Sequence, residues 1–204
     1  IAETLGATIN SLPDNKLEII GSKAFQPSAE EYNKAESLTI NCGESGLSMR
    51  MFTPIAALYP TPLSITGTGS LLKRPMDFYV DLLPKLGITI QSNEGKAPLH
   101  LEEKLLPTAI EIDGSLSSQF LTGLLIAFAK AAKEEVEIKV NNLNSKPYIN
   151  LTLQLLQKFG YSVSHTDFKE FKIHPATISE ETIEYTVEAD WSSASFILVA
   201  AAIN

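Results

Sequence analysis

Asp113-Gly-Ser-Leu-Ser-Ser-Gln-Phe120 marks the corner between a short alternating stretch and a long apolar one. The alternating residues before it predict a strand, and the apolar residues 121–132 after it predict a helix. Ser117 or Ser118 can cap this helix, so that free backbone N–H groups, two hydroxyls and the Gln119 amide face one space. Such a corner favours an anion, because these donors and the positive helix end act together. The alternative is that the serines only cap the helix, a common role for serine.

Similar corners recur along the chain, each with a predicted strand, a few small polar residues and an apolar helix. The strands are expected at residues 38–41, 110–113 and 185–190. Between the corners, a glycine ends a helix and two short strands follow, at Gly6, Gly87 and Gly160. The chain therefore predicts an α/β (α+β) fold built from β-α-β-α-β-β units that repeat about every 75 residues. Because the helices after the corners are apolar on nearly all sides, we expect buried parallel helices with the sheets outside.

The composition is that of an ordinary globular protein, with 44% hydrophobic and 20% charged residues. The net charge of −8 argues against partners such as nucleic acid or an anionic membrane, so any bound anion needs a local site. The one cysteine, Cys42, excludes an internal disulfide and fits a reducing compartment. No signal peptide or membrane-spanning segment is recognisable, and we expect a cytoplasmic protein.

Arginine is rare in this chain, because only Arg50 and Arg74 occur among 16 basic residues. Arg74 precedes a proline and lies where a strand gives way to a helix start. A planar guanidinium can grip phosphate or carboxylate with two hydrogen bonds, so we interpret Arg74 as an anion ligand. A surface salt bridge is the alternative for Arg74. Arg50 lies inside a helix, and we interpret it as the structural partner of a buried carboxylate.

Ser145-Lys-Pro-Tyr148 repeats this pattern at another corner. Ser145 can cap the helix, Lys146 adds charge, and Tyr148 offers a ring with a hydroxyl. The alternative for Tyr148 is a core aromatic whose hydroxyl reaches the surface. The glycines in residues 41–48 permit a close approach of the backbone to a ligand. No metal-site spacing is found around the histidines, which fall on strands or turns outside the corners: His100, His165 and His174.

Four of these stretches together closely resemble the enolpyruvylshikimate-phosphate synthases, and the resemblance covers essentially the whole chain. The stretches are Lys73-Arg-Pro75, residues 113–120, Ser145-Lys-Pro-Tyr-Ile149 with Leu151-Thr152, and residues 187–195. The resemblance implies a two-lobed enzyme whose lobes each hold three repeated units. Residues 1–188 would form most of the N-terminal lobe, and residues 189–204 would be a truncated crossing into the second lobe.

By this resemblance the reaction is the transfer of an enolpyruvyl group from phosphoenolpyruvate to shikimate 3-phosphate in aromatic amino-acid biosynthesis. No metal or cofactor is implied, and we expect a monomer. Shikimate 3-phosphate would be held by Ser117, Ser118 and Ser145 beside Tyr148, phosphoenolpyruvate by Arg74 and the Gly46 backbone, and Gln119 would bridge both substrates.

Two departures from the family pattern bear on activity. Glu44-Ser-Gly-Leu47 stands where the family usually has Asn-Ala-Gly-Thr, and a carboxylate opposes anion binding unless it faces away or pairs with a cation such as Arg50. The family's early Gly-Ser-Lys-Ser stretch and its second-lobe acid and base are absent, so we expect the catalytic residues outside this chain and no activity from it alone. Two alternatives stay open: an enolpyruvyl transferase acting on a UDP-sugar, and a non-catalytic scaffold that binds a phosphorylated ligand.

Overall fold

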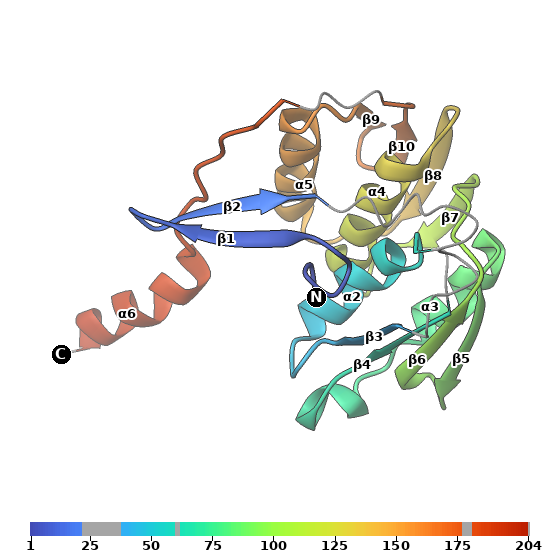
Figure 1. Cartoon of the computed structure of the whole chain (residues 1–204), viewed down its shortest axis with the longest axis horizontal. Helices are drawn as coiled ribbons and strands as arrows, with labels where there is room; N and C mark the ends of the chain where they lie inside the picture. Colours follow the sequence, from blue (N-terminus) through green and yellow to red (C-terminus); the bar gives the residue numbers. More distant parts are fainter. Residues whose placement is uncertain (22–37, 60–61, 177–180, 204) are drawn as a thin grey trace.

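The computed structural model describes residues 1–21, 38–59, 62–176 and 181–203. Two complete β-α-β-α-β-β units follow one another (Figure 1). The first contains β3 (Leu38–Asn41), α2 (Gly46–Ala56), β4 (Leu63–Thr66), the 3-10 turn η1 (Gly69–Lys73), α3 (Asp77–Leu82), η2 (Leu83–Leu86), β5 (Thr89–Asn93) and β6 (Lys96–Glu102). The second contains β7 (Ile110–Asp113), α4 (Ser118–Ala131), β8 (Val136–Asn141), α5 (Lys146–Lys158), β9 (Val163–Thr166) and β10 (Glu170–Ile173). Outside these units lie β1 (Thr8–Leu12), β2 (Lys16–Ile20) and α6 (Trp191–Ile203).

The two units form sheets with the same strand order, β3-β4-β6-β5 and β7-β8-β10-β9. In each sheet the first two strands are parallel, because a helix carries the chain back between them, and the tight hairpin that follows is antiparallel. The hairpin of β1 and β2 repeats the final hairpin of a unit. The predicted repeat and the α/β fold class are therefore confirmed.

Three glycines end the chain segments before the hairpins in the left-handed conformation. Their φ angles are +90°, +81° and +82°, at Gly6, Gly87 and Gly160. Glycine adopts this conformation without a steric penalty, so the same residue closes the same turn in each copy. The backbone geometry thus confirms the prediction that a glycine ends the segment before each hairpin.

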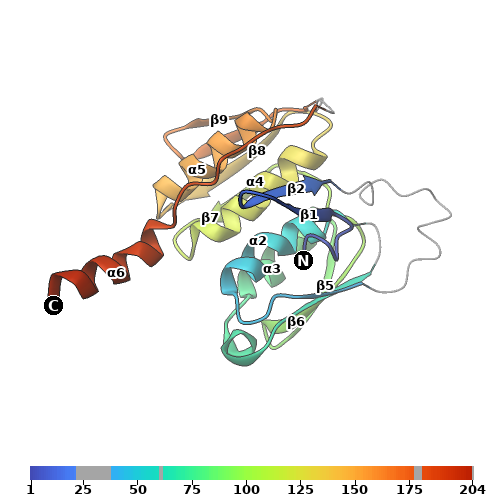
Figure 2. The same ribbon diagram turned by 60° about the vertical axis from the view of Figure 1, so that its left-hand side comes forward.

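Helices α2 and α4 lie side by side in both views, with α2 against β4 and α4 against β10 (Figures 1 and 2). Gly123 makes this close approach possible, since a Cβ atom there would lie 2.5 Å from the Met51 carbonyl oxygen. Helix α4 buries most of its apolar residues, including Leu124, whereas α2 buries Met49 and Ala56 but leaves Leu47 exposed. The expectation of a buried helix is therefore confirmed for α4 and holds only in part for α2.

The third predicted strand and its helix behave differently. Residues 185–190 form no strand, because no described strand lies beside them to share backbone hydrogen bonds. Helix α6 extends away from the two units and has no buried residue, so the expectation that it is buried is wrong for the part of the chain described here (Figure 1). Among the described helices, none is both long enough and apolar enough to span a bilayer.

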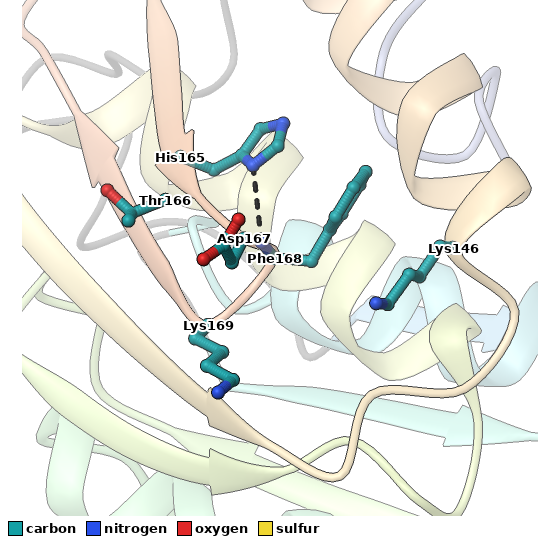
Figure 3. Close-up of a pocket in the computed structure, with 6 residues that line it drawn as sticks. All are labelled: Lys146, His165, Thr166, Asp167, Phe168 and Lys169. Carbon is teal, nitrogen blue, oxygen red and sulfur yellow. Dashed lines mark hydrogen bonds between the residues drawn. The ribbon is translucent and has the colours of Figure 1, made fainter.

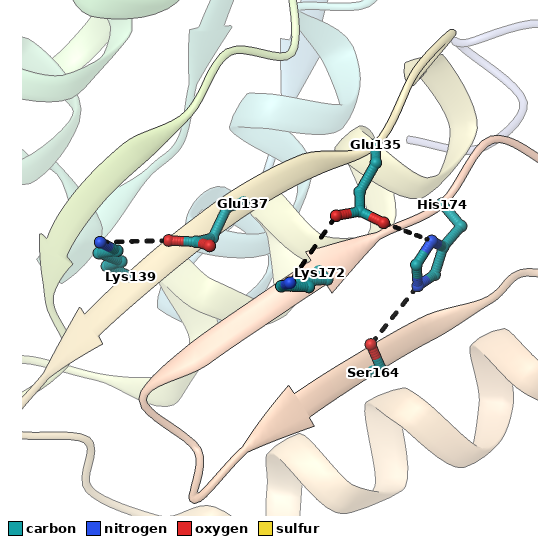
Figure 4. Close-up of polar contacts among 6 residues, drawn as sticks. All are labelled: Glu135, Glu137, Lys139, Ser164, Lys172 and His174. Atoms are coloured by element: carbon teal, nitrogen blue, oxygen red, sulfur yellow. Dashed lines mark hydrogen bonds and ion pairs between the residues drawn. The ribbon is translucent and has the colours of Figure 1, made fainter.

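Polar side chains on the second sheet hold its strands together across their outer surface (Figure 4). Glu135 contacts His174 at 3.2 Å and Lys172 at 3.9 Å, and Ser164 Oγ lies 3.4 Å from His174 Nε2. The fold thus arranges a carboxylate, a histidine and a serine in one continuous series of polar contacts. Since 54% of the Glu135 side chain is exposed and Lys172 competes for it, we interpret the group as a solvated ion-pair network.

Candidate functional site

The three strand-to-helix corners share one local turn. In each, a side-chain oxygen accepts a hydrogen bond from the backbone N–H two residues further on, which folds the chain back toward the helix start. The pairs are Asn41 with Gly43 at 2.8 Å, Asp113 with Ser115 at 2.8 Å, and Asp190 with Ser192 at 2.9 Å. The third corner keeps this turn although the strand before it is absent.

Arg74 lies against the start of α2 in the first unit. The Ser45 hydroxyl caps this helix by accepting from the Ser48 N–H at 3.1 Å. A Cβ atom on Gly46 would lie 2.6 Å from Arg74 Nη1 and 3.7 Å from Arg50 Nη1. Two guanidinium groups therefore lie beside the same backbone position, where any side chain would displace that of Arg74. The prediction that Arg74 and Gly46 share a corner agrees with this geometry, although their binding of a substrate stays a prediction.

Arg50 has a different role from the one expected. Its Nη1 donates to Gln119 Oε1 at 3.2 Å, and its guanidinium lies 5.5 Å from the Phe120 ring centre. Within the described ranges it forms no ion pair with a carboxylate, so the interpretation of a buried acidic partner is not supported by the described structure. Burial lowers the pKa of Arg50, and the neighbouring charge of Arg74 lowers it further. Two like charges at one place favour a bound anion, which would relieve their repulsion.

An aromatic cluster fixes the backbone of Arg50. Tyr79 is fully buried and donates its hydroxyl to the Arg50 carbonyl oxygen. Its ring meets Phe120 edge-on at 5.1 Å, and Phe78 stacks on Phe120 at 4.3 Å. Burial raises the pKa of Tyr79 well above its ordinary value, which keeps the hydroxyl protonated as a donor. The sequence did not indicate Arg50 as a site residue, although it lies four residues after Gly46 and so shares one face of α2.

The second unit presents hydroxyls at the start of α4. The Ser117 hydroxyl accepts from the Gln119 N–H at 3.2 Å, so the capping interpretation is confirmed for this serine. Ser118 is 7% exposed, and its hydroxyl makes no hydrogen bond to any described residue. Ser117 can still donate its own hydroxyl hydrogen while it caps. This corner can therefore offer two hydroxyl donors to an anion.

Ser145 lies beside this corner because two loops are hydrogen-bonded together. Asn144 Nδ2 donates to the Ser115 carbonyl oxygen at 3.0 Å. Ser145 adopts a left-handed conformation with a φ of +56°, and its side chain makes no capping hydrogen bond to α5. Tyr148, one turn into α5, is 60% exposed, so the alternative of a core aromatic is wrong. The four residues predicted for shikimate 3-phosphate are thus carried by adjacent helix starts.

The start of α5 also faces a surface hollow (Figure 3). Lys146 extends toward the ring of Phe168, 5.5 Å from its centre, and so points to the turn between β9 and β10. His165 Nδ1 accepts from the Phe168 N–H at 3.3 Å inside that turn. The expectation that His165 lies outside the corners agrees with this position. No group of side chains in the described ranges is arranged to hold a metal ion.

Within the described structure Glu44 makes no ion pair with Arg50, so the expectation that these two side chains pair is wrong. Its carboxylate oxygen Oε2 instead lies 3.3 Å from the Ser70 N–H nitrogen and 3.5 Å from the Ser70 hydroxyl. The carboxylate is therefore directed to η1, the turn that leads into Arg74.

The repeated fold and the paired corners define a class of α/β protein that gathers arginine and hydroxyl groups at neighbouring helix starts. Residues 1–204 match the family model for EPSP synthase (3-phosphoshikimate 1-carboxyvinyltransferase), so the chain belongs to this family.

Relatives and solved structures agree with this membership. The chain is 35% identical over 201 residues to a 3-phosphoshikimate 1-carboxyvinyltransferase of Clostridium beijerinckii, which covers 98% of this chain and 46% of the relative. It is 36% identical over 167 residues to the enzyme of that name from Nitrosopumilus maritimus, across 81% and 39% of the two chains. The EPSP synthase of Acinetobacter baumannii superposes with a TM-score of 0.70 at 25% identity, over 98% and 43% of the chains. The chain thus spans about half the length of the curated relatives it matches.

Proposed function

We propose that this chain supplies substrate-binding groups for enolpyruvyl transfer from phosphoenolpyruvate to shikimate 3-phosphate. One observation carries the proposal: Arg50 and Arg74 meet at Gly46, and Arg50 bridges through Gln119 to the serine corner. Two adjacent anion corners of different chemistry suit two different anionic substrates. The family membership of the chain supports the same reaction.

The two corners divide the substrates between them. Arg74 and the backbone at Gly46 hold phosphoenolpyruvate, whose phosphate and carboxylate suit a planar guanidinium. Arg50 adds a second positive charge to this corner. Shikimate 3-phosphate lies at the other corner, where its phosphate is held by the serine hydroxyls and helix N–H groups beside Tyr148: Ser117, Ser118 and Ser145.

In the proposed reaction, a hydroxyl of shikimate 3-phosphate gives its proton to the base and adds to the central carbon of phosphoenolpyruvate, while the methylene carbon gains a proton from the acid. The phosphate then leaves with the electrons of its C–O bond, and the new methyl group loses a proton, which restores the carbon–carbon double bond on the new ether. Oxidation states balance without a redox cofactor. Gln119 lies between the corners and orients the two substrates, and the guanidiniums stabilise the negative charge on the departing phosphate. The acid and base of this scheme lie outside the chain in our proposal.

The domain division belongs to the same proposal. Residues 1–188 form most of one lobe, and residues 189–204 lead into another. The exposed apolar surface of α6, which includes Trp191 and Phe196, supports this division because such a helix needs further protein to cover it. We also propose that the enzyme is cytoplasmic and monomeric. Both statements rest on the composition and on the family.

Separate titrations of this chain with each substrate test the proposal. We expect shikimate 3-phosphate to shift the amide NMR signals of Gln119, Ser145, Lys146 and Tyr148, and phosphoenolpyruvate to shift those around Gly46. A phosphate-release assay with both substrates present should detect no turnover by the chain alone.

A UDP-sugar serves as the control ligand for the alternative transferase. Binding of the UDP-sugar without binding of shikimate 3-phosphate would reject the proposed substrate. Binding of a phosphorylated ligand at these corners by the full-length protein, without turnover, would favour the scaffold alternative.

A further inference from the structure

Glu44 joins the corner of the first unit to the turn that carries Arg74. Its Oε2 accepts hydrogen bonds from the Ser70 backbone N–H at 3.3 Å and from the Ser70 hydroxyl at 3.5 Å. The carboxylate also lies flat on Gly69, where a Cβ atom would be 2.5 Å from the Glu44 Cδ atom. We infer that Glu44 is a positioning residue: it fixes η1 so that the Arg74 guanidinium reaches the Gly46 backbone. This inference rests on the proposed role of Arg74 as a phosphoenolpyruvate ligand.

Backbone contacts make the turn a short, rigid link. The Thr68 N–H donates to the Gly43 carbonyl oxygen at 2.7 Å. Leu71, in the middle of η1, is fully buried, and the Arg74 N–H donates to its carbonyl oxygen at 3.1 Å. Between these anchors, the residues that remain to be fixed are Gly69 and Ser70, and these are the residues that Glu44 contacts. A change at Glu44 is therefore transmitted to Arg74 through the short segment that begins at Ser70.

The same contacts hold the Glu44 carboxylate on η1, where, within the described residues, it makes no ion pair with either arginine. A free carboxylate in an anion corner would compete with the ligand for both guanidiniums. Two donors from Ser70 hold it on η1 instead, and none of the described ion pairs joins it to Arg50 or Arg74. The corresponding place after the Asx turn of the second unit is Leu116, which is 69% exposed. This tether, the pair of hydrogen bonds from Ser70 to the Glu44 carboxylate, thus occurs at the arginine corner and not at the serine corner.

Arginine NMR offers a direct test that needs no ligand. The chain has two arginines, Arg50 and Arg74, so selective labelling with ¹⁵N-arginine gives two Nε signals. In Glu44→Ala, we expect the heteronuclear NOE of Arg74 to fall sharply while that of Arg50 stays unchanged, because Gln119 still holds Arg50. Glu44→Gln keeps an acceptor oxygen and should leave both signals as in the natural chain.

Ligand affinity gives the second readout. Loss of the tether should weaken phosphoenolpyruvate binding about fivefold in Glu44→Ala, the equivalent of one net hydrogen bond. Binding of shikimate 3-phosphate should be unchanged, which separates a local effect from a loss of folding. Glu103→Ala is the matched control, since that carboxylate accepts the Thr89 N–H at 2.9 Å in the same unit, away from both corners. In an Arg74→Lys background, Glu44→Ala should have little further effect, because the two changes act on one interaction.

Two results would overturn the inference. Unchanged Arg74 dynamics in Glu44→Ala would show that Glu44 positions nothing. Tighter phosphoenolpyruvate binding in both Glu44→Ala and Glu44→Gln would show that the carboxylate acts only as an opposing charge. Failure of the natural chain to bind phosphoenolpyruvate would reject the proposed function, while the arginine signals would still decide the role of Glu44.

Discussion

The first unit presents two guanidinium groups at its corner, whereas the second presents serine hydroxyls. Both units nevertheless share one strand order, and both corners are built on the same Asx turn, at Asn41 and at Asp113. The difference lies in the residues at the helix starts, such as Arg74 in one unit and Ser145 in the other. Under the proposed function, the repeat therefore sets where a ligand lies, and the residues at a few positions near the helix starts determine which ligand it is.

The largest effect is expected from separating the two units. Gly123→Leu would drive a side chain into α2, because even a Cβ atom would lie 2.5 Å from the Met51 carbonyl oxygen. We expect a loss of about 3 kcal/mol in the free energy of unfolding, measured with urea. Gly21→Leu is the control, since a Cβ atom there would meet nothing within 4 Å. Equal stability of the two variants would contradict the close contact of α2 with α4.

A substitution at one corner should weaken the binding of one substrate and leave the binding of the other unchanged. Arg74→Lys keeps the charge but loses the planar fork, so phosphoenolpyruvate binding should weaken about tenfold with stability nearly unchanged. Ser118→Ala should instead weaken binding of shikimate 3-phosphate. Calorimetry with each ligand checks both variants. If one variant weakened both ligands equally, the division of substrates between the corners would be wrong.

The serine caps should contribute equally to the two units. Ser45 and Ser117 each accept a backbone hydrogen bond, at 3.1 and 3.2 Å. Ser45→Ala and Ser117→Ala should each lower the free energy of unfolding by about 1 kcal/mol in thermal or urea denaturation. Ser145→Ala should lower it less, since Ser145 makes no capping hydrogen bond. A loss at Ser145 as large as at Ser117 would show that its hydroxyl serves stability.

The smallest effect concerns pH. The Asp113 carboxylate accepts hydrogen bonds from the backbone N–H and from the hydroxyl of Ser115. These bonds, the first more than the second, hold the pKa of Asp113 below its ordinary value. A depressed folded-state pKa adds stability above the unfolded pKa, near 3.9, and that stability is lost as the pH falls through the folded value. Asp113→Asn should therefore reduce the loss of unfolding free energy between pH 7 and pH 3, and Asn41→Asp should increase it. An identical pH profile in all three proteins would contradict the common turn.

Much of the fold could be predicted because its signals are local. The left-handed glycines, such as Gly87, and the strand alternation before Asp113 depend on residues close in sequence. Residues 185–190 were predicted wrongly as a strand because a strand needs a neighbour that sequence alone does not show. For Arg50 a carboxylate partner was predicted that the described residues do not supply, and its bond to Gln119 was missed because Gln119 lies 69 residues away along the chain. The tether from Glu44 to Ser70 likewise became visible only when two loops were placed together.

The left-handed backbone of Ser145 sets stability against affinity. A residue with a Cβ atom at a φ of +56° costs roughly 1 kcal/mol relative to glycine, which adopts this conformation freely. Ser145→Gly would therefore give a more stable protein with one hydroxyl fewer for a phosphate. Under the proposed function this replacement would trade affinity for shikimate 3-phosphate against stability, whereas without the proposed phosphate contact it would raise stability at no cost in affinity.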